Sequence, residues 1–196
     1  MNYEQRLFLK NFIQQPSIVG SIIPSSKYLC FSMLKHINFE SSKCIVEYGA
    51  GTGIFTKEII RRKNKDTLFI SFELNKDMFS NLKKLHSPNE NIYIINDSAE
   101  NMMNYLNEQG CAEVDYIISG LPFTVLPREV SENILNNTFQ VLSHEGSFIT
   151  FQYSLHFFKT FKEIFPKVQL GLQLLNLPPA FIYYCNKVET QTYEYG

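Results

Sequence analysis

Short apolar runs alternate along the chain with stretches whose apolar residues recur at helical spacing. The runs are rich in β-branched and aromatic residues, which is typical of strands buried on both faces. They predict strands over Cys44–Val46, Leu68–Glu73, Ile92–Ile95, Val114–Ile118, Ser147–Gln152, Val168–Leu175 and Ala180–Cys185. Strands that alternate with helices predict an α/β fold with a mostly parallel sheet and helices on both faces.

The helical stretches lie between these runs and carry recognisable end signals. Pro16 ends the first helix, Ser25 or Ser26 can cap the second, and Asn75 can cap the fourth. The predicted helices cover Tyr3–Gln15, Tyr28–Leu34, Phe55–Lys63, Met78–Leu85, Ala99–Leu106 and Pro127–Ser143. The first is amphipathic, so it either packs on the sheet or lies on a membrane surface.

Composition narrows the class of protein. With 196 residues, 44% of them hydrophobic, and no proline-rich or glycine-rich linker, the chain is expected to form one domain, residues 1–196. A net charge of −1 makes a large nucleic-acid partner less favoured. Cys30, Cys44, Cys111 and Cys185 are far apart, which predicts reduced thiols in a cytoplasmic protein and no metal site. No apolar run is long enough for a membrane span, so membrane contact would be peripheral.

The turn after the first strand is the strongest chemical signal. Gly49, Gly51 and Gly53 alternate there, and glycine permits positive φ and lets backbone amides approach a ligand closely. Position 54 is Ile54, so the spacing departs from the dinucleotide fingerprint, in which the third glycine comes three positions after the second. A pyrophosphate site is therefore disfavoured.

Acidic residues end three successive strands around this turn. Glu47 precedes the glycines, Glu73 ends the second strand 20 positions after Gly53, and Asp97 follows the third strand. Nucleoside-binding α/β folds place a ribose-binding carboxylate at about the position of Glu73, and parallel strands bring their carboxyl ends to one edge. Each acid alone could be a solvated loop residue or a helix cap, but the three together predict a nucleoside-type ligand.

The Glu47–Gly53 stretch resembles the E-x-G-x-G-x-G signature of class I S-adenosylmethionine-dependent methyltransferases. The resemblance implies a Rossmann-like, seven-stranded, mostly parallel sheet with one antiparallel strand in the edge region. It also implies that Glu47 faces the ammonium group of S-adenosyl-L-methionine, that Glu73 binds the ribose, and that Asp97 contacts the adenine amine. The implied cofactor-binding residues are Glu47, Tyr48, Gly49, Ala50, Gly51, Gly53, Glu73, Leu74, Asp97, Ser98, Ala99 and Ser119.

A narrower resemblance, to bacterial phospholipid N-methyltransferases, covers Gly20 to about Tyr184. It rests on G-x-x-x-P-S-S at 20–26, S-G-L-P-F at 119–123 and N-L-P-P-A at 176–180. Tyr48 and Ala50 depart from the family, which usually has Leu and Pro there. The resemblance implies that residues 1–40 form a helical segment over the cleft of a Rossmann-like core, 41–196.

The same resemblance implies transfer of methyl to an amine, with phosphatidylethanolamine or its methylated forms as the favoured acceptor. Attack needs a neutral amine, which the carbonyls of Gly120, Leu121 and Pro122 could orient. Aromatic rings of Tyr28, Phe123 and Tyr153 could steady the developing cation. Gln152 and Tyr153 are candidates for the substrate wall. Residues 3–15 would meet the inner face of the membrane through Leu7, Phe8, Phe12, Ile13, Arg6 and Lys10.

Two other functions stay open. The glycine turn and the L-P-F segment also resemble RNA adenine dimethyltransferases, although Gly120 occupies the position where those enzymes carry a side-chain carbonyl. Such enzymes normally add a basic RNA-binding domain, whereas this sequence ends 12 residues after Tyr184. The remaining possibility is a protein that binds S-adenosylmethionine without turnover.

Overall fold

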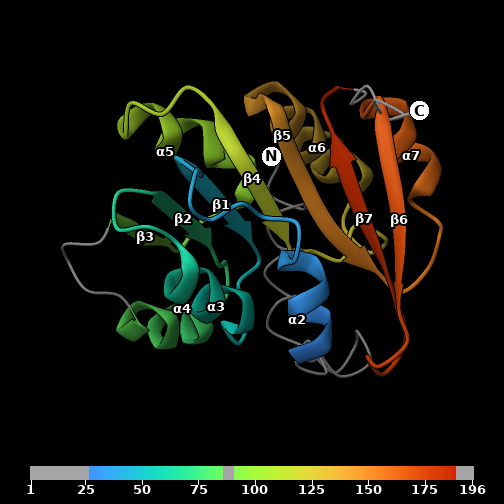
Figure 1. The fold of residues 1–196 in the computed structure, drawn as a ribbon, viewed down its shortest axis with the longest axis horizontal. Helices are drawn as coiled ribbons and strands as arrows, with labels where there is room; N and C mark the ends of the chain where they lie inside the picture. Colours follow the sequence, from blue (N-terminus) through green and yellow to red (C-terminus); the bar gives the residue numbers. More distant parts are fainter. Residues whose placement is uncertain (1–26, 86–90, 189–196) are drawn as a thin grey trace, which may run out of the picture.

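The computed structural model describes residues 27–85 and 91–188. Its centre is a seven-stranded sheet in the order β3-β2-β1-β4-β5-β7-β6, which Figure 1 shows from β3 on the left to β6 on the right. The strands are β1 Cys44–Tyr48, β2 Leu68–Phe72, β3 Ile92–Ile95, β4 Val114–Ser119, β5 Leu142–Gln152, β6 Lys167–Gln173 and β7 Ala180–Asn186. The predicted fold class is confirmed.

One strand runs against the others. β7 pairs antiparallel with both β5 and β6, whereas the pairs among β1 to β5 are parallel. The antiparallel strand therefore lies second from the edge, between β5 and the outermost strand β6. This arrangement brings the turn between β6 and β7 to the same edge of the sheet as the carboxyl end of β5, because Gln152 pairs with Phe181.

Helices cover both faces of the sheet. They are α2 Lys27–Leu34, α3 Ile54–Arg62, α4 Lys76–Leu82, α5 Met102–Glu108, α6 Arg128–Val141 and α7 Phe158–Ile164. Apolar residues of α2, α3 and α4 pack with those of one sheet face, among them Ile45 and Phe69. Residues of α5, α6 and α7 pack with those of the other face, among them Val46, Phe72 and Phe148. Burial of both faces explains why the central strands β1 and β2 read as continuous apolar runs.

The largest differences from the predicted elements lie around β5 and α7. The helix expected to reach Ser143 ends at Val141, and β5 starts at Leu142 instead of Ser147. Helix α7 was not predicted, because its sequence, Phe158–Ile164, is short and aromatic. The Asn75 cap is confirmed, since its side chain accepts hydrogen bonds from the amides of Asp77 and Met78.

Within residues 27–85 and 91–188, none of the helices is both long enough and apolar enough to cross a bilayer. The helix predicted over 3–15 and the segment 20–26 lie outside the described residues, so the proposed membrane contact of residues 3–15 stays a prediction.

Candidate active site

The glycine turn is tied to the ends of β2 and β4 by backbone hydrogen bonds. The amides of Gly49 and Ala50 donate to the Phe72 carbonyl at 2.8 and 3.2 Å, and the Gly120 amide donates to the Tyr48 carbonyl at 2.8 Å. Gly49, Gly51 and Gly53 all have positive φ, at 68°, 56° and 79°. The alternating glycines are thus needed for the path of the backbone itself.

The three glycines differ in what surrounds them. A Cβ on Gly49 would lie 2.9 Å from the Leu121 side chain, and one on Gly53 would lie 2.6 Å from that of Leu82. A Cβ on Gly51 would meet no atom within 4 Å. The backbone at Gly51 therefore borders open space. Such space is required where a ligand approaches the main chain.

Glu73 holds this turn from the neighbouring strand. One carboxylate oxygen accepts the Gly51 amide at 2.7 Å, and the other accepts the Asn75 amide at 2.7 Å. Burial raises the pKa of the Glu73 carboxyl, while the hydrogen bonds from Asn75 and Gly51 act in the opposite direction. The predicted ribose ligand and the predicted glycine loop are therefore in direct contact.

Glu47 is completely buried at the end of β1. Its Oε2 accepts hydrogen bonds from the hydroxyls of Thr56 and Ser71, both at 2.7 Å. Its Oε1 has no hydrogen-bond partner among the described residues. Burial raises the pKa of this carboxyl to about 7, against the effect of the Ser71 and Thr56 hydrogen bonds. A buried carboxylate oxygen without a donor is costly unless a ligand supplies one.

The loop after β3 joins the same edge of the sheet. The Glu73 amide donates to the Ile95 carbonyl at 2.9 Å, and the Asn96 side chain donates to the carbonyls of Glu73 and Leu74 at 2.8 and 3.1 Å. Asp97 is half-buried and accepts hydrogen bonds from the Ser98 amide, the Asn101 side chain and the Tyr105 hydroxyl. Ser98 and Ala99, which follow it, are buried. The strand ends that carry Glu47, Glu73 and Asp97 thus meet as predicted.

The Ser119–Phe123 loop is bound from two sides. The Ser119 hydroxyl accepts the Leu121 amide at 3.1 Å, and the Leu121 carbonyl accepts both the Phe123 amide and the Gln152 side chain, at 3.1 and 3.0 Å. A Cβ on Gly120 would lie 2.8 Å from the Gly49 carbonyl oxygen. Position 120 must therefore be glycine for the loop to pack against the glycine turn.

Three predicted substrate contacts need correction. The Phe123 ring is fully buried, with Phe148, Phe157 and Phe161 around it at centroid distances of 5.8 to 6.1 Å, so it belongs to the core. Gln152 is buried and holds the Leu121 carbonyl, so it supports the loop and does not form a substrate wall. The Leu121 carbonyl already accepts two hydrogen bonds, which makes it a poor acceptor for an amine.

Tyr48 also differs from its predicted place in the cofactor set. Its side chain is buried, and its hydroxyl contacts Met102 Sδ at 2.8 Å and the Thr138 hydroxyl at 3.1 Å. Burial raises the pKa of this hydroxyl. Only the Tyr48 backbone, through its bond to Gly120, takes part in the turn. The alternation of side chains along β1 explains this, because Glu47 and Tyr48 must point to opposite faces.

Two other predicted substrate-site residues, Pro122 and Tyr153, follow the carboxyl ends of β4 and β5. The Pro122 carbonyl accepts the Val125 amide at 3.1 Å. Tyr153, directly after β5, is 49% exposed and meets the Phe151 ring edge to face at 5.6 Å. Sequence analysis missed the supporting roles of Thr56 and Ser71, because a hydroxyl in a helix or strand carries no pattern of its own.

Comparisons with known proteins identify relatives over most of the chain. Residues 7–161 match the family model described as ribosomal RNA adenine dimethylase. The chain is 29% identical over 184 residues to an ornithine lipid N-methyltransferase of Singulisphaera acidiphila, an alignment that covers 93% of this chain and 96% of that protein. The family match covers most of the chain, and the second alignment spans nearly all of both proteins.

Solved structures share the fold at low sequence identity. A 1,6-didemethyltoxoflavin-N1-methyltransferase of Burkholderia thailandensis, solved with S-adenosylhomocysteine, superposes with a TM-score of 0.70 at 10% identity, covering 96% of this chain and 91% of that one. TrmN of Thermus thermophilus superposes with a TM-score of 0.64 at 14% identity over 82% of this chain, which spans 48% of that protein. At such identities the likeness concerns the fold alone.

Proposed function

We propose that this chain, which belongs to the ribosomal RNA adenine dimethylase family and so is a class I S-adenosylmethionine-dependent methyltransferase, methylates the amine of a lipid headgroup. The observation that carries the proposal is the similarity to an ornithine lipid N-methyltransferase over nearly the whole of both chains. Phosphatidylethanolamine, its methylated forms and ornithine lipids are the acceptors we propose to test, because ethanolamine and ornithine both present a primary amine.

The described residues fit the cofactor. S-adenosylmethionine supplies an electrophilic methyl group on a sulfonium centre. Glu47 would hold the ammonium group, because its buried Oε1 lacks a donor and a cation there would satisfy it. Open space at Gly51 leaves room for close approach to the main chain. Glu73 would bind the ribose while keeping the Gly51 amide in place, and Asp97 would take the adenine amine.

The other predicted cofactor-binding residues lie near the same strand ends. Gly49, Ala50 and Gly53 fix the turn. Ser119 ends β4, while Leu74 follows β2 and Ser98 and Ala99 follow β3. These residues would contribute backbone groups and apolar contact. For Tyr48 the contribution is limited to its backbone, since its side chain is buried among α5 and α6.

For the acceptor amine, the Gly120 carbonyl is the group we assign to orient an N–H. It stands beside the glycine turn, and the neighbouring carbonyls of Leu121 and Pro122 already accept hydrogen bonds. Nucleophilic attack requires the neutral amine, so the ammonium group must first lose a proton to water. The Gly120 carbonyl would then accept a remaining N–H and so orient the lone pair of the nitrogen toward the methyl group. The exposed ring of Tyr153 is available to steady the alkylammonium product.

Methylation of RNA adenine is the second candidate, and the family match favours it. The packing at Gly120 opposes it, because a side chain that could bind a base amine from this position would collide with the Gly49 carbonyl oxygen. The net charge of −1 also gives no support for binding a polyanion. A protein that binds the cofactor without turnover is the third candidate.

One experiment separates these functions. Purified full-length protein is incubated with S-adenosylmethionine labelled in its methyl group and, in parallel, with phosphatidylethanolamine vesicles, ornithine lipid vesicles, ribosomal RNA and small amines. We expect label in a lipid fraction only, and loss of this label in a Glu73→Ala variant. Label in the RNA would establish the second candidate. Cofactor binding by calorimetry without label in any acceptor would support the third.

A further inference from the structure

The turn between β6 and β7 carries exposed leucines that no part of the methyl-transfer site uses. Leu174, Leu175 and Leu177 are 67%, 66% and 75% exposed. The side chain of Leu172, at the end of β6, is 55% exposed as well. Single exposed apolar residues are normal on protein surfaces, but a contiguous group of large ones indicates an interaction site.

Helix α2 extends this group. The Gln173 side chain donates to the Tyr28 carbonyl at 3.2 Å and to the Ser32 hydroxyl at 2.8 Å, which fixes the first turn of α2 beside the end of β6. Tyr28 and Phe31 of that helix are 59% and 69% exposed. We call the combined surface the apolar edge: Tyr28, Phe31, Leu172, Leu174, Leu175 and Leu177.

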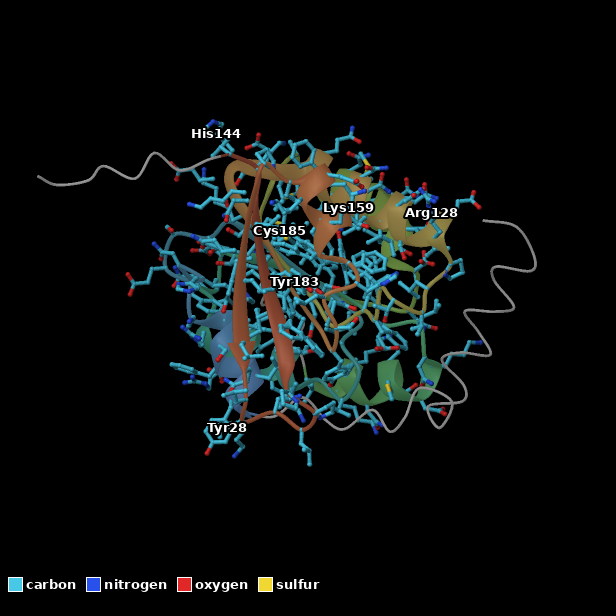
Figure 2. All side chains as sticks on the ribbon, turned by 90° about the vertical axis from the view of Figure 1, so that its right-hand side faces the viewer. Tyr28, Arg128, His144, Lys159, Tyr183 and Cys185 are labelled. Atoms are coloured by element: carbon cyan, nitrogen blue, oxygen red, sulfur yellow. The ribbon has the colours of Figure 1, made fainter. Side chains whose placement is uncertain are left out.

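The apolar edge lies at the same end of the sheet as the candidate active site. β7 starts where β5 ends, because Phe181 pairs with Gln152. Gln152 in turn binds the Leu121 carbonyl of the Ser119–Phe123 loop, which we call the acceptor loop. Figure 2 shows Tyr28 at the end of the molecule where β6 and β7 are joined, opposite His144 at the other end of β5. A surface that holds the apolar edge would therefore face the acceptor loop.

The segments that form the apolar edge contain no acidic residue. In a chain with 19 acidic residues, neither 27–39 nor 167–187 contains Asp or Glu. No residue from 168 to 186 carries a charge. Lys27, directly before Tyr28, is exposed, whereas Lys167 and Lys187 lie at the opposite end of β6 and β7, where Lys167 pairs with Asn186. An uncharged apolar tip with an exposed cation beside it is complementary to an anionic lipid surface.

We infer that the apolar edge is a membrane-docking surface, in which the leucines of the β6–β7 turn and the aromatic rings of α2 enter the headgroup region of an anionic lipid layer. This inference deepens the proposed function and rests on it for the identity of the substrate. It concerns described residues, and it is independent of the membrane contact predicted for residues 3–15.

The test uses the full-length chain and a variant with Leu174→Ser, Leu175→Ser and Leu177→Ser. Flotation is measured with vesicles of phosphatidylglycerol and phosphatidylethanolamine in equal parts, and with phosphatidylcholine vesicles. Tyr93→Ser is the matched control, because Tyr93 is an exposed aromatic residue on β3, at the far edge of the sheet. Thermal unfolding and cofactor binding are recorded for each protein.

We expect the wild type and Tyr93→Ser to float with the anionic vesicles and the leucine variant to bind them about tenfold more weakly or worse. Thermal unfolding, cofactor binding and activity on detergent-dispersed lipid should be unchanged. Equal flotation of wild type and leucine variant would overturn the inference, as would a wild type that ignores vesicles or prefers phosphatidylcholine.

Other occupants of the apolar edge give different results. A second copy of the chain would appear as a dimer that the leucine variant converts to a monomer, and coverage by residues 1–26 would appear as a lower unfolding temperature of that variant. Either result would overturn the inference. Flotation that depends on the leucines, without methyl transfer to any lipid, would refute the proposed function while leaving the docking surface in place.

Discussion

The Glu73 carboxylate accepts a hydrogen bond from the Gly51 amide at 2.7 Å, across 22 positions of sequence. The same carboxylate accepts the Asn75 amide, so it joins the glycine turn after β1 to the start of α4. A residue expected only to bind ribose therefore also holds the loop that surrounds the ligand. Removing it should disturb both functions together.

For Glu73→Ala we expect S-adenosylmethionine to bind about tenfold more weakly or worse, and the free energy of unfolding to fall by about 2 kcal/mol, because two partly buried amides lose a charged acceptor. Calorimetry and chemical denaturation measure the two effects. Glu108→Ala, which removes an exposed carboxylate from α5, is the control and should match the wild type. Unchanged affinity in Glu73→Ala would contradict the assigned role.

Glu47 should make stability depend on pH in an unusual direction. Its pKa is about 7 in the folded chain against an ordinary value of 4.5, so the folded chain holds this proton more tightly than the unfolded chain. The stabilisation from this group is complete below pH 4.5 and is lost as the pH rises through 7. Across this window the free energy of unfolding of Glu47→Gln should rise relative to that of the wild type, by up to about 3 kcal/mol. Thermal unfolding of both proteins at pH 5 and pH 8 measures the difference.

The same carboxyl should govern the pH dependence of cofactor binding. If the ionised Glu47 holds the ammonium group, affinity for S-adenosylmethionine rises as the pH passes from below to above about 7. The Glu47→Gln variant should bind more weakly, and its affinity should be nearly flat over this range. Calorimetric titrations at several pH values decide the matter. Parallel pH profiles in both proteins would exclude Glu47 from the ammonium site.

Gly120 should tolerate no side chain. A Cβ would lie 2.8 Å from the Gly49 carbonyl oxygen, a backbone atom that cannot rotate away. Gly120→Ala should therefore cost about 1 to 3 kcal/mol of stability, the usual effect of overpacking, and should reduce methyl transfer. Gly171→Ala is the matched control, because its Cβ would make ordinary contact at 3.4 Å with the Tyr184 ring. Equal unfolding temperatures for the two variants would show that the loop can move apart freely.

Substitutions of Phe123 and Tyr153 should separate a loss of stability from a loss of turnover. Phe123→Ala removes a fully buried ring from an aromatic cluster, so we expect a loss of about 3 to 5 kcal/mol in stability. Tyr153→Ala changes a half-exposed residue and should leave stability and cofactor affinity unaltered while lowering turnover. Steady-state kinetics combined with denaturation curves tests both. Normal turnover in Tyr153→Ala would remove it from the acceptor site.

Cys111 should be the most reactive of the four thiols. Cys111 is half-buried, whereas Cys30, Cys44 and Cys185 are buried. Interaction with the Cys44 thiol lowers the pKa of Cys111, whereas burial raises the pKa of Cys30 to about 12 and raises that of Cys185. Iodoacetamide at neutral pH should label Cys111 first, as read by peptide mass spectrometry. Labelling should slow in Cys44→Ala, which lacks the interacting thiol. Earlier labelling of Cys30 or Cys185 would contradict this order.

The sequence by itself determined the sheet and the glycine turn. The central strands β1 and β2 are buried on both faces and are therefore visible as apolar runs, and β3 was predicted to the residue over Ile92–Ile95. Positive φ at Gly49, Gly51 and Gly53 requires glycine, so the turn is visible too. Because parallel strands share one carboxyl edge, the convergence of Glu47, Glu73 and Asp97 followed from their positions alone.

Only the tertiary structure decided where individual side chains point. The Phe123 ring could enter the site or the core, and it enters the core because Phe157 and Phe161, more than 30 positions later, supply its neighbours. The Leu121 carbonyl lost its predicted role to Gln152 in the same way. The exposure of Leu174, Leu175 and Leu177 could not be predicted from the sequence, for the same reason. The sequence shows that a residue is apolar and therefore favours burial. It does not show which surface covers that residue, because this depends on contacts between distant segments.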